Sequence, residues 1–259
     1  LIKDWGSITQ LGSIRSTRPT NFMLAAEWNA VLCHDGGPFF INDWVAKPYT
    51  SNFSGGFARF SNGKATEFTE YITYDKYTNT SKNKTYDGLK QRFENSNYST
   101  TYNSYYEGPH FQFAGSELSF SDRSDATTAD TVELPFPHNK STLKYNKETG
   151  TYDYYEYGAA HLDPLHDSAQ LTFKNVILQD TTFSELGEGY LIYNAIDTTG
   201  RSGYYITNGQ AIEITWKKSG ESDITVYYDK KTGQEIELNT GKTYISLIPS
   251  DSWSNVVIK

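Results

Sequence analysis

The chain has little of the chemistry that marks disulfide-bonded, membrane-spanning or nucleic-acid-binding proteins. Its 259 residues include one cysteine, Cys33, so no disulfide can form within the chain. No apolar run approaches the roughly 18 residues that a membrane-spanning helix needs. Its 31 acidic residues outnumber its 23 basic ones, and the formal net charge is −8. This charge argues against nucleic acid as a partner and against direct binding to an anionic membrane surface.

The short motifs of common catalytic and cofactor sites are also missing. The sequence contains no G-x-S-x-G nucleophile elbow, P-loop, dinucleotide fingerprint, H-E-x-x-H motif or EF-hand loop. Cys33 ends the apolar run of residues 30–33, where a buried small hydrophobe is a more ordinary role than a catalytic thiol. We therefore expect no cofactor and no metal, and the sequence leaves open whether the protein is an enzyme.

One turn brings two histidines beside two carboxylates. His161, Asp163, His166 and Asp167 lie in the run H-L-D-P-L-H-D, where Pro164 favours a turn. Two histidines and a carboxylate can ligate zinc, although this spacing matches no compact zinc motif. A hydrogen-bonded corner is the alternative. We keep His161 and Asp163 as candidate ligand-binding residues.

Aromatic residues and turn signals, in contrast, are abundant. The chain has 21 tyrosines, which bury area while keeping a polar tip and so help a β-rich protein of modest apolar content to build a core. After residue 110, short alternating segments are separated by turns such as those at 146–150 and 207–209. The pattern predicts an α+β protein whose C-terminal half is nearly all β, in an antiparallel meander. We expect an N-terminal α+β domain over residues 1–122 and a C-terminal β-rich domain over residues 123–259.

Residues 71–106 are rich in Tyr, Asn, Thr and Ser and poor in aliphatic side chains. We expect a helix over residues 86–94 within a polar excursion across the surface. Tyrosine rings on a polar surface suit sugar rings, whose C–H faces pack on aromatic faces while their hydroxyls meet amides and carboxylates. The ordinary alternative is that tyrosines cover half-buried sheet faces. An adhesive surface is a further hypothesis for this segment.

The segment from Gly12 to residue 37 holds the most informative stretch. Arg15 and Arg18 come just before Pro19, which fits the first position of a helix reaching residue 29. A buried strand over residues 30–33 is expected next, with His34 at its end before a Gly-Gly turn.

Helix-start amides, guanidinium groups and an imidazole can together bind an anion. We therefore take Arg15 and Arg18 as candidate anion-binding residues and His34 as the candidate acid–base residue, and we expect all three in one cleft. The alternatives are ion pairs or capping contacts for the arginines, and a hydrogen bond that holds the turn for the histidine.

Several motifs, in order along the chain, carry a resemblance to a known family. They are G-S-I-R-S-T-R-P at 12–19, H-L-D at 161–163, N-V-I-L at 175–178, G-E-G at 187–189, the run from N-G to T-W at 208–216, and the run from G-K-T to P at 241–249. This series resembles the YerB-like family of Gram-positive bacterial lipoproteins, whose biochemical role is not established. The match runs from about Gly12 to Pro249 and is poor over about 50–110.

The resemblance implies layered sheets with helices on one side. It also implies a full-length protein with a signal peptide, a lipid-modified cysteine and a further N-terminal segment. The protein would then be extracytoplasmic and anchored to the membrane only through a lipid that this chain lacks. Since Leu1 opens a strand-like run, we expect the start of the chain to be a sheet edge exposed by processing or trimming.

Two functional hypotheses follow. The first is a binding or scaffold protein of the cell envelope, with a cell-wall polymer or an envelope protein as its partner. The second is a hydrolase or transferase that acts on an anionic cell-wall substrate through Arg15, Arg18 and His34. The two hypotheses differ in whether these groups and a carboxylate such as Asp163 converge on one pocket.

Overall fold

The computed structural model describes residues 8–98, 110–187 and 189–259, and it divides into two compact units. The N-terminal unit comprises Leu1–Gly108 with Glu221–Ile224, and the C-terminal unit comprises Pro109–Gly220 with Thr225–Lys259. The division falls at Gly108, whereas the sequence placed the boundary after residue 122. Phe120 explains the difference, because its ring packs against Tyr205 in the core of the C-terminal unit. The sheet edge expected at Leu1 lies outside the described residues.

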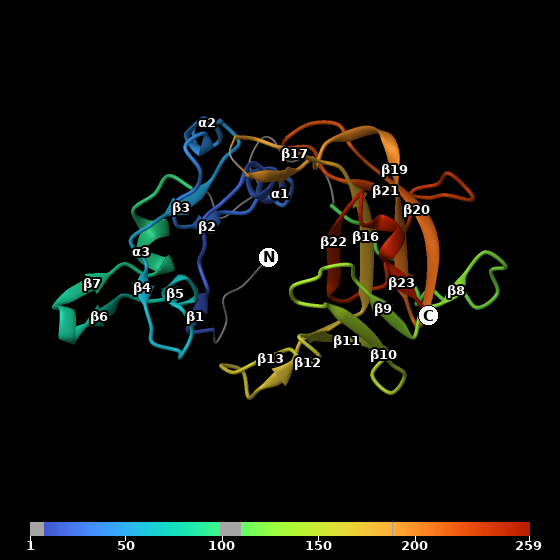
Figure 1. Ribbon diagram of the computed structural model, residues 1–259, viewed down its shortest axis with the longest axis horizontal. Helices are drawn as coiled ribbons and strands as arrows, with labels where there is room; N and C mark the ends of the chain where they lie inside the picture. The colour runs from blue at the N-terminus through green and yellow to red at the C-terminus, as the bar shows by residue number, and fades with distance from the viewer. Residues whose placement is uncertain (1–7, 99–109, 188) are drawn as a thin grey trace. The chain divides into compact units, whose positions relative to one another are not determined.

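Short elements build the N-terminal unit, which contains all three described α-helices (Figure 1). Its elements are β1 (Gln10–Gly12), α1 (Pro19–Glu27), β2 (Leu32–His34), α2 (Ile41–Val45), β3 (Asn52–Ser54), β4 (Ala58–Arg59), the 3-10 turn Thr66–Phe68, β5 (Glu70–Thr73), β6 (Tyr77–Asn79), the 3-10 turn Thr80–Lys82, β7 (Lys84–Tyr86) and α3 (Leu89–Glu94). Strands β1, β5 and β4 form one antiparallel sheet, and β6 pairs with β7.

The start of helix α1 agrees with the sequence. Pro19 occupies the first helical position, and the Asn21 side chain accepts a hydrogen bond from the Arg18 backbone N–H at 2.9 Å. The chain then passes through β2 and α2 to β3, which pairs with β2 in parallel, His34 opposite Ser54. A small cluster of Ile14, Phe53, Phe57 and Ile72 lies beneath these elements.

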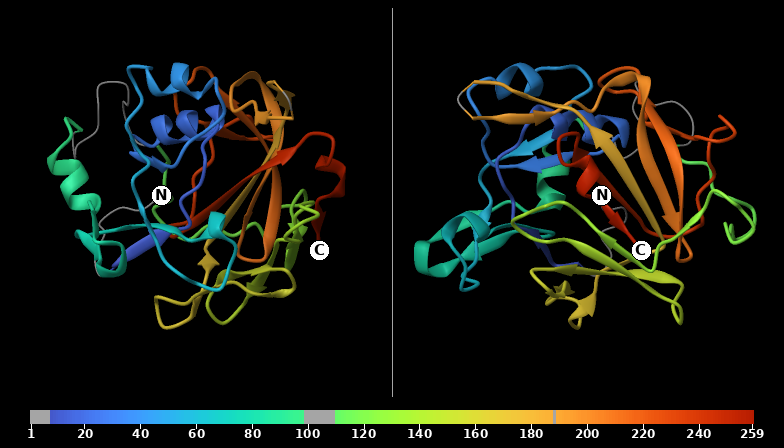
Figure 2. Two further views of the ribbon diagram at one scale, coloured as in Figure 1. Left: turned by 60° about the vertical axis from the view of Figure 1, so that its left-hand side comes forward. Right: turned by 45° about the vertical axis from the view of Figure 1, so that its right-hand side comes forward.

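The C-terminal unit is nearly all β, as the sequence predicts, and the longest described strands belong to it (Figure 2). They are β8 (Thr127–Thr128), β9 (Thr131–Glu133), β10 (Thr142–Asn146), β11 (Thr151–Glu156), β12 (Ala159–Ala160), β13 (Leu162–Asp163), β14 (Ala169–Gln170), β15 (Thr172–Phe173), β16 (Asn175–Thr181), β17 (Phe183–Glu185), β18 (Leu191–Tyr193), β19 (Asp197–Thr207), β20 (Gln210–Lys218), β21 (Val226–Asp229), β22 (Thr243–Pro249) and β23 (Val257–Ile258), with a 3-10 turn at Trp253–Asn255. One sheet has the order β21-β20-β19-β16-β22, and another has the order β12-β11-β10-β9-β23.

Strand β16 is buried on both faces, which is why Val176, Ile177 and Leu178 follow one another without a polar residue between them. Val176 and Leu178 join the core shared with the β9–β11 sheet. Ile177 points to the opposite face and packs with Trp216 and Tyr205. Most pairs in this unit are antiparallel, but β16 and β22 are parallel, so the unit is not the pure meander that the turn spacing suggested.

The mostly antiparallel α+β architecture is therefore confirmed. Among the residues that the structure describes, no helix is long and apolar enough to cross a membrane.

Candidate functional site

The segment around Arg15 packs directly on the turn that follows β2. The Asp35 N–H donates to the Arg15 carbonyl at 3.0 Å, and the Thr17 N–H donates to the Gly36 carbonyl at 3.1 Å. The backbones of the two predicted regions are thus hydrogen-bonded to each other.

The two arginine side chains, however, are each bound to other groups of the protein. Arg15 Nη2 pairs with Glu67 Oε2 at 2.9 Å, and its guanidinium lies over the Phe68 ring. Arg18 Nη1 donates to the Thr17 carbonyl at 2.7 Å and to Ser16 Oγ at 3.2 Å. These are the ion-pair and local hydrogen-bond contacts of the alternative interpretation.

His34 is buried, with an exposed fraction of 3%. Its Nδ1–H donates to the Gly36 carbonyl at 3.1 Å, and Nε2 lies 3.2 Å from Asn52 Oδ1 on the neighbouring strand β3. The edge of the Phe22 ring packs against the imidazole. Both ring nitrogens thus contact groups of the protein. The imidazole therefore positions Asn52 rather than offering a free nitrogen to a ligand.

Asn52 belongs to a pocket of about 670 Å³ within the N-terminal unit, which we call the Arg92 pocket. Its volume is within the range of small-molecule sites. Strand β3, strand β7, helix α3 and the chain that follows α3 form its walls. Its lining residues are Asn52, Phe53, Gly56, Lys84, Thr85, Tyr86, Asp87, Arg92, Asn95, Ser96, Asn97 and Tyr98.

Two side chains fix the walls of this pocket. Tyr98 Oη accepts from the Asn52 N–H at 3.0 Å and donates to the Asn52 carbonyl at 2.9 Å. Arg92 Nη2 donates to the carbonyls of Gly55 and Gly56 at 2.9 and 2.8 Å, and its Nε donates to the Asp87 carbonyl. Both glycines have positive φ, which a glycine adopts without strain. These hydrogen bonds link two walls of the pocket, because they join α3 and the chain after it to β3 and the glycine turn.

The Gly55 turn is also close to a pair of carboxyl groups. A Cβ placed on Gly55 would lie 3.2 Å from Asp35 Oδ1, and Asp35 shares a hydrogen bond with the buried Glu70. Burial raises the pKa of Glu70 to about 7, and the neighbouring Asp35 adds to the shift. Arg59, whose Nη2 is 2.9 Å from Glu70 Oε2, opposes it.

Cys33 belongs to the same unit. Burial raises the pKa of its thiol to about 11. The group is therefore a neutral thiol at pH 7, which agrees with the interpretation of Cys33 as a small hydrophobe rather than a nucleophile.

The other two predicted site residues belong to the C-terminal unit. His161 Nδ1 lies 3.2 Å from Glu156 Oε2, and its ring packs on Tyr154. Asp163 Oδ1 accepts from the Leu165 N–H at 3.0 Å, which closes the turn between β13 and β14. Among the described residues, no three His, Cys, Asp or Glu side chains are grouped to hold a metal ion.

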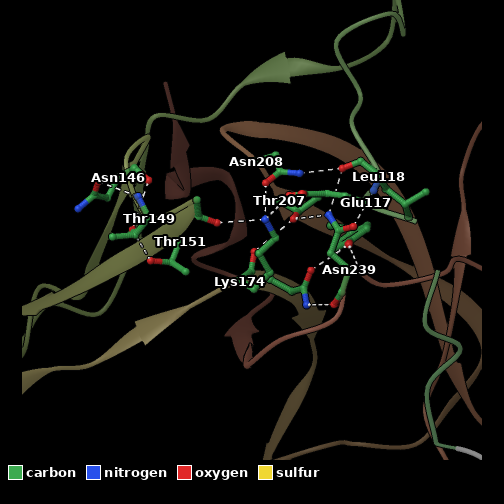
Figure 3. Close-up of polar contacts among 12 residues, drawn as sticks. Glu117, Leu118, Asn146, Thr149, Thr151, Lys174, Thr207, Asn208 and Asn239 are labelled. Atoms are coloured by element: carbon green, nitrogen blue, oxygen red, sulfur yellow. Dashed lines mark hydrogen bonds and ion pairs between the residues drawn. The ribbon is translucent and has the colours of Figure 1, made fainter. Parts of the chain in front are cut away.

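A polar network in the C-terminal unit joins several of the sequence motifs (Figure 3). Asn175 is fully buried, donates to the Asn239 carbonyl at 2.7 Å and accepts from Tyr205 Oη at 3.0 Å. Asn239 in turn accepts from the Leu118 N–H at 2.7 Å and donates to Thr207 Oγ1 at 3.0 Å. The amides of Asn175 and Asn239 thus bond to other groups of the protein, and in this way they link neighbouring strands.

Lys174 stands at the edge of this network. Its ammonium contacts the Glu117 carboxylate and Asn208 Oδ1, and it borders a pocket of about 420 Å³ with Ser116 and Thr240 (Figure 3). The exposed Glu117 has its pKa lowered by its hydrogen bond to Lys174. The Lys174 ammonium of this second pocket is thus already paired with the Glu117 carboxylate.

Sequence reasoning missed the residues of the Arg92 pocket. A signal was present in the Tyr- and Asn-rich segment, where Lys84-Thr85-Tyr86 alternates as a strand and Gly88 precedes a helix. The predicted helix over residues 86–94 begins at Leu89 instead, and Tyr86 ends strand β7.

Comparisons with known proteins agree with this fold. The C-terminal domain of the DUF3048 proteins, described as proteins of unknown function, matches residues 132–245, and the N-terminal domain of the same proteins matches residues 6–98. The crystal structure of YerB from Bacillus subtilis superposes with a TM-score of 0.73 at 17% identity, and the match covers 97% of this chain and 78% of that one. No curated protein sequence matches the chain. The chain thus belongs to the DUF3048 family, with a YerB-like fold.

Proposed function

We propose that this protein is a non-catalytic binding protein of the bacterial cell envelope and that the Arg92 pocket is its ligand site. The observation that supports this most is the pocket itself, because its polar lining is held in shape by Tyr98 and Arg92. His34, the candidate acid–base residue, supports one wall through Asn52. The site therefore offers hydroxyl, amide and cationic groups with which to bind a polar ligand.

The envelope location is part of the proposal and rests on the resemblance to a lipoprotein family. An extracytoplasmic, lipid-anchored protein would meet cell-wall polymers and envelope proteins as partners. The acidic chain would be repelled by an anionic membrane surface, so a lipid rather than its own charge would hold it there.

Co-sedimentation with purified Gram-positive cell walls tests the proposal. We expect the wild-type protein to sediment with the walls and Tyr86→Ala to remain in the supernatant, because Tyr86 lines the pocket. Tyr157→Ala is the matched control, since Tyr157 is 73% exposed in the C-terminal unit. Equal sedimentation of wild type and Tyr86→Ala, or none by the wild type, would rule out this pocket as the envelope site.

One observation favours the second candidate, an enzyme acting on an anionic cell-wall substrate. Asp35 and Glu70 share a hydrogen bond, and the raised pKa of Glu70 would let it donate a proton near neutral pH. Loss of cell-wall hydrolysis or transfer in Glu70→Gln, with binding retained, would support the enzyme. Turnover that is absent from the wild type, or unchanged in the variant, would count against it.

A further inference from the structure

We propose that the Arg92 pocket recognises a sugar ring that carries a negatively charged substituent, a carboxylate or a phosphate. This inference rests on the proposed function of the same pocket and names the chemical class of its ligand. It depends on three features of the lining: aromatic rings, open amides and a net positive charge.

The aromatic feature is provided by Tyr86 and Tyr98. Tyr98 is fixed by its two hydrogen bonds to Asn52, and its ring packs against Phe53 at a centroid distance of 5.5 Å. Tyr86 is held in β7, with the Tyr77 ring 6.3 Å away. Rings that are fixed before binding lose little conformational freedom when the apolar face of a sugar packs on them.

The amide feature lies in the chain that follows α3. Within the part of the chain that the structure describes, the side-chain amides of Asn95 and Asn97 make no hydrogen bond with the protein. An amide offers both a donor and an acceptor, which matches a hydroxyl group that needs both. These two side chains line the same pocket as the tyrosines, a combination suited to a hydroxyl-rich ring.

The positive charge of the lining favours an anionic sugar over a neutral one. Lys84 lies over the Tyr86 ring, 4.7 Å from its centroid, and no carboxylate pairs with it among the described residues. Arg92 uses Nε and Nη2 to hold backbone carbonyls, while Nη1 has no hydrogen-bond partner in the described ranges. Asp87, the carboxylate of the lining, is 3.8 Å from Lys76. Asp87 also attracts the Arg92 guanidinium. The lining thus holds two cations and one carboxylate, and its remaining positive charge favours an anion.

The proposal is tested by calorimetric titration of the intact chain with four probes. These are a glucuronic acid oligosaccharide, glucose 6-phosphate, a neutral glucose oligosaccharide of equal length and inorganic phosphate. We expect at least one anionic sugar to bind about ten-fold more tightly than the neutral sugar and than phosphate alone, and we expect binding to weaken with added salt. The two anionic probes distinguish a carboxylate from a phosphate substituent.

Lys84→Gln is the decisive variant, because its ammonium holds no structural contact beyond the Tyr86 ring. We expect it to bind the anionic sugar about ten-fold more weakly. Lys90→Gln is the matched control: it removes the same charge from the adjacent helix α3 but not from the pocket lining.

Several results would overturn the inference. A neutral sugar that binds as well as the anionic one would do so, as would equal affinity in Lys84→Gln and Lys90→Gln. If none of the sugars binds but cell walls still retain the wild type and not Tyr86→Ala, the ligand class is wrong while the envelope function stands. If neither sugars nor walls bind, both proposals fail.

Discussion

In the C-terminal unit, the amides of Asn175 and Asn239 are buried and bonded to other parts of the same network. In the N-terminal unit, the amides of Asn95 and Asn97 line the Arg92 pocket and make no bond to the described protein. The same residue type thus stabilises strands in one unit and remains available for a ligand in the other. The contrast suggests that polar motif residues maintain the fold in the C-terminal unit, whereas recognition belongs to the N-terminal unit.

The hydrophobic cores of the two units also differ, and the larger core belongs to the C-terminal unit. Two apolar clusters cover opposite faces of the large C-terminal sheet, and together they include Trp216, Tyr205 and the interior of β16. The N-terminal unit has a cluster of four buried residues beneath its short strands. Substitutions in the C-terminal unit should therefore affect stability most, and substitutions around the Arg92 pocket should affect binding most.

The largest effect is expected for Trp216→Ala. Trp216 is fully buried, and its indole N–H donates to the Asp180 carbonyl at 3.1 Å. Removing the ring leaves a cavity, while the Asp180 carbonyl keeps its hydrogen bond from Arg201 Nε, so the free energy of unfolding should fall by about 4 kcal/mol, mainly through the cavity. Urea denaturation monitored by circular dichroism measures this loss. A loss below about 1 kcal/mol would contradict the assignment of the main core to this sheet.

Asn239→Ala should have the next largest effect. Its side chain bonds the Leu118 N–H, the Leu118 carbonyl and Thr207 Oγ1. Its loss removes all three bonds and takes this partner from the Leu118 N–H, while the Leu118 carbonyl keeps its bond from Asn208 and Thr207 Oγ1 keeps its bond to the Lys174 carbonyl. We expect the free energy of unfolding to fall by about 2–3 kcal/mol, with sugar and cell-wall binding unchanged. The neighbouring, exposed Thr240→Ala is the control and should change stability little. A loss of binding without loss of stability would move recognition into the C-terminal unit.

The Asp35–Glu70 pair gives a smaller effect that depends on pH. Because the folded-state pKa of Glu70 is raised from 4.5 to about 7, the folded chain holds a proton that the unfolded chain releases. The resulting stability is full below pH 4.5 and is lost as the pH rises through about 7, with a change of about 3 kcal/mol. Glu70→Gln should flatten this dependence in denaturation measured from pH 4 to 8. The exposed Glu67→Gln should leave it intact, and a flat wild-type profile would contradict the raised pKa.

Local features of the fold were predictable because local chemistry determines them. Pro19 marks the start of α1, and Asn208-Gly209, both with positive φ, form the predicted turn between β19 and β20. The parallel pairing of β16 with β22 was not predictable, because it joins segments far apart in sequence and turn signals report only neighbouring strands.

The candidate site shows the same division between local and long-range information. The sequence singled out His34, but its role depends on Asn52, which reaches it only through the parallel pairing of β2 and β3. Arg92 lies 58 residues after His34 in the sequence. Spacing alone could not connect it to the His34 segment, because its contacts to Gly55 and Gly56 form only in the folded chain.

The smallest effect is expected at Arg15 and Arg18, the anion-binding residues predicted from the sequence. Arg15 forms an exposed ion pair with Glu67, with side-chain exposures of 45% and 58%, so Arg15→Ala should lower the free energy of unfolding by less than about 1 kcal/mol. The double variant Arg15→Ala, Arg18→Ala should still bind cell walls and anionic sugars, because neither side chain lines the Arg92 pocket. Calorimetric titration beside Lys84→Gln compares the two sites directly. If the double variant stays folded by circular dichroism yet loses anion binding while Lys84→Gln retains it, then recognition lies at Arg15 and Arg18, and the contrast between the pocket and the motif is reversed.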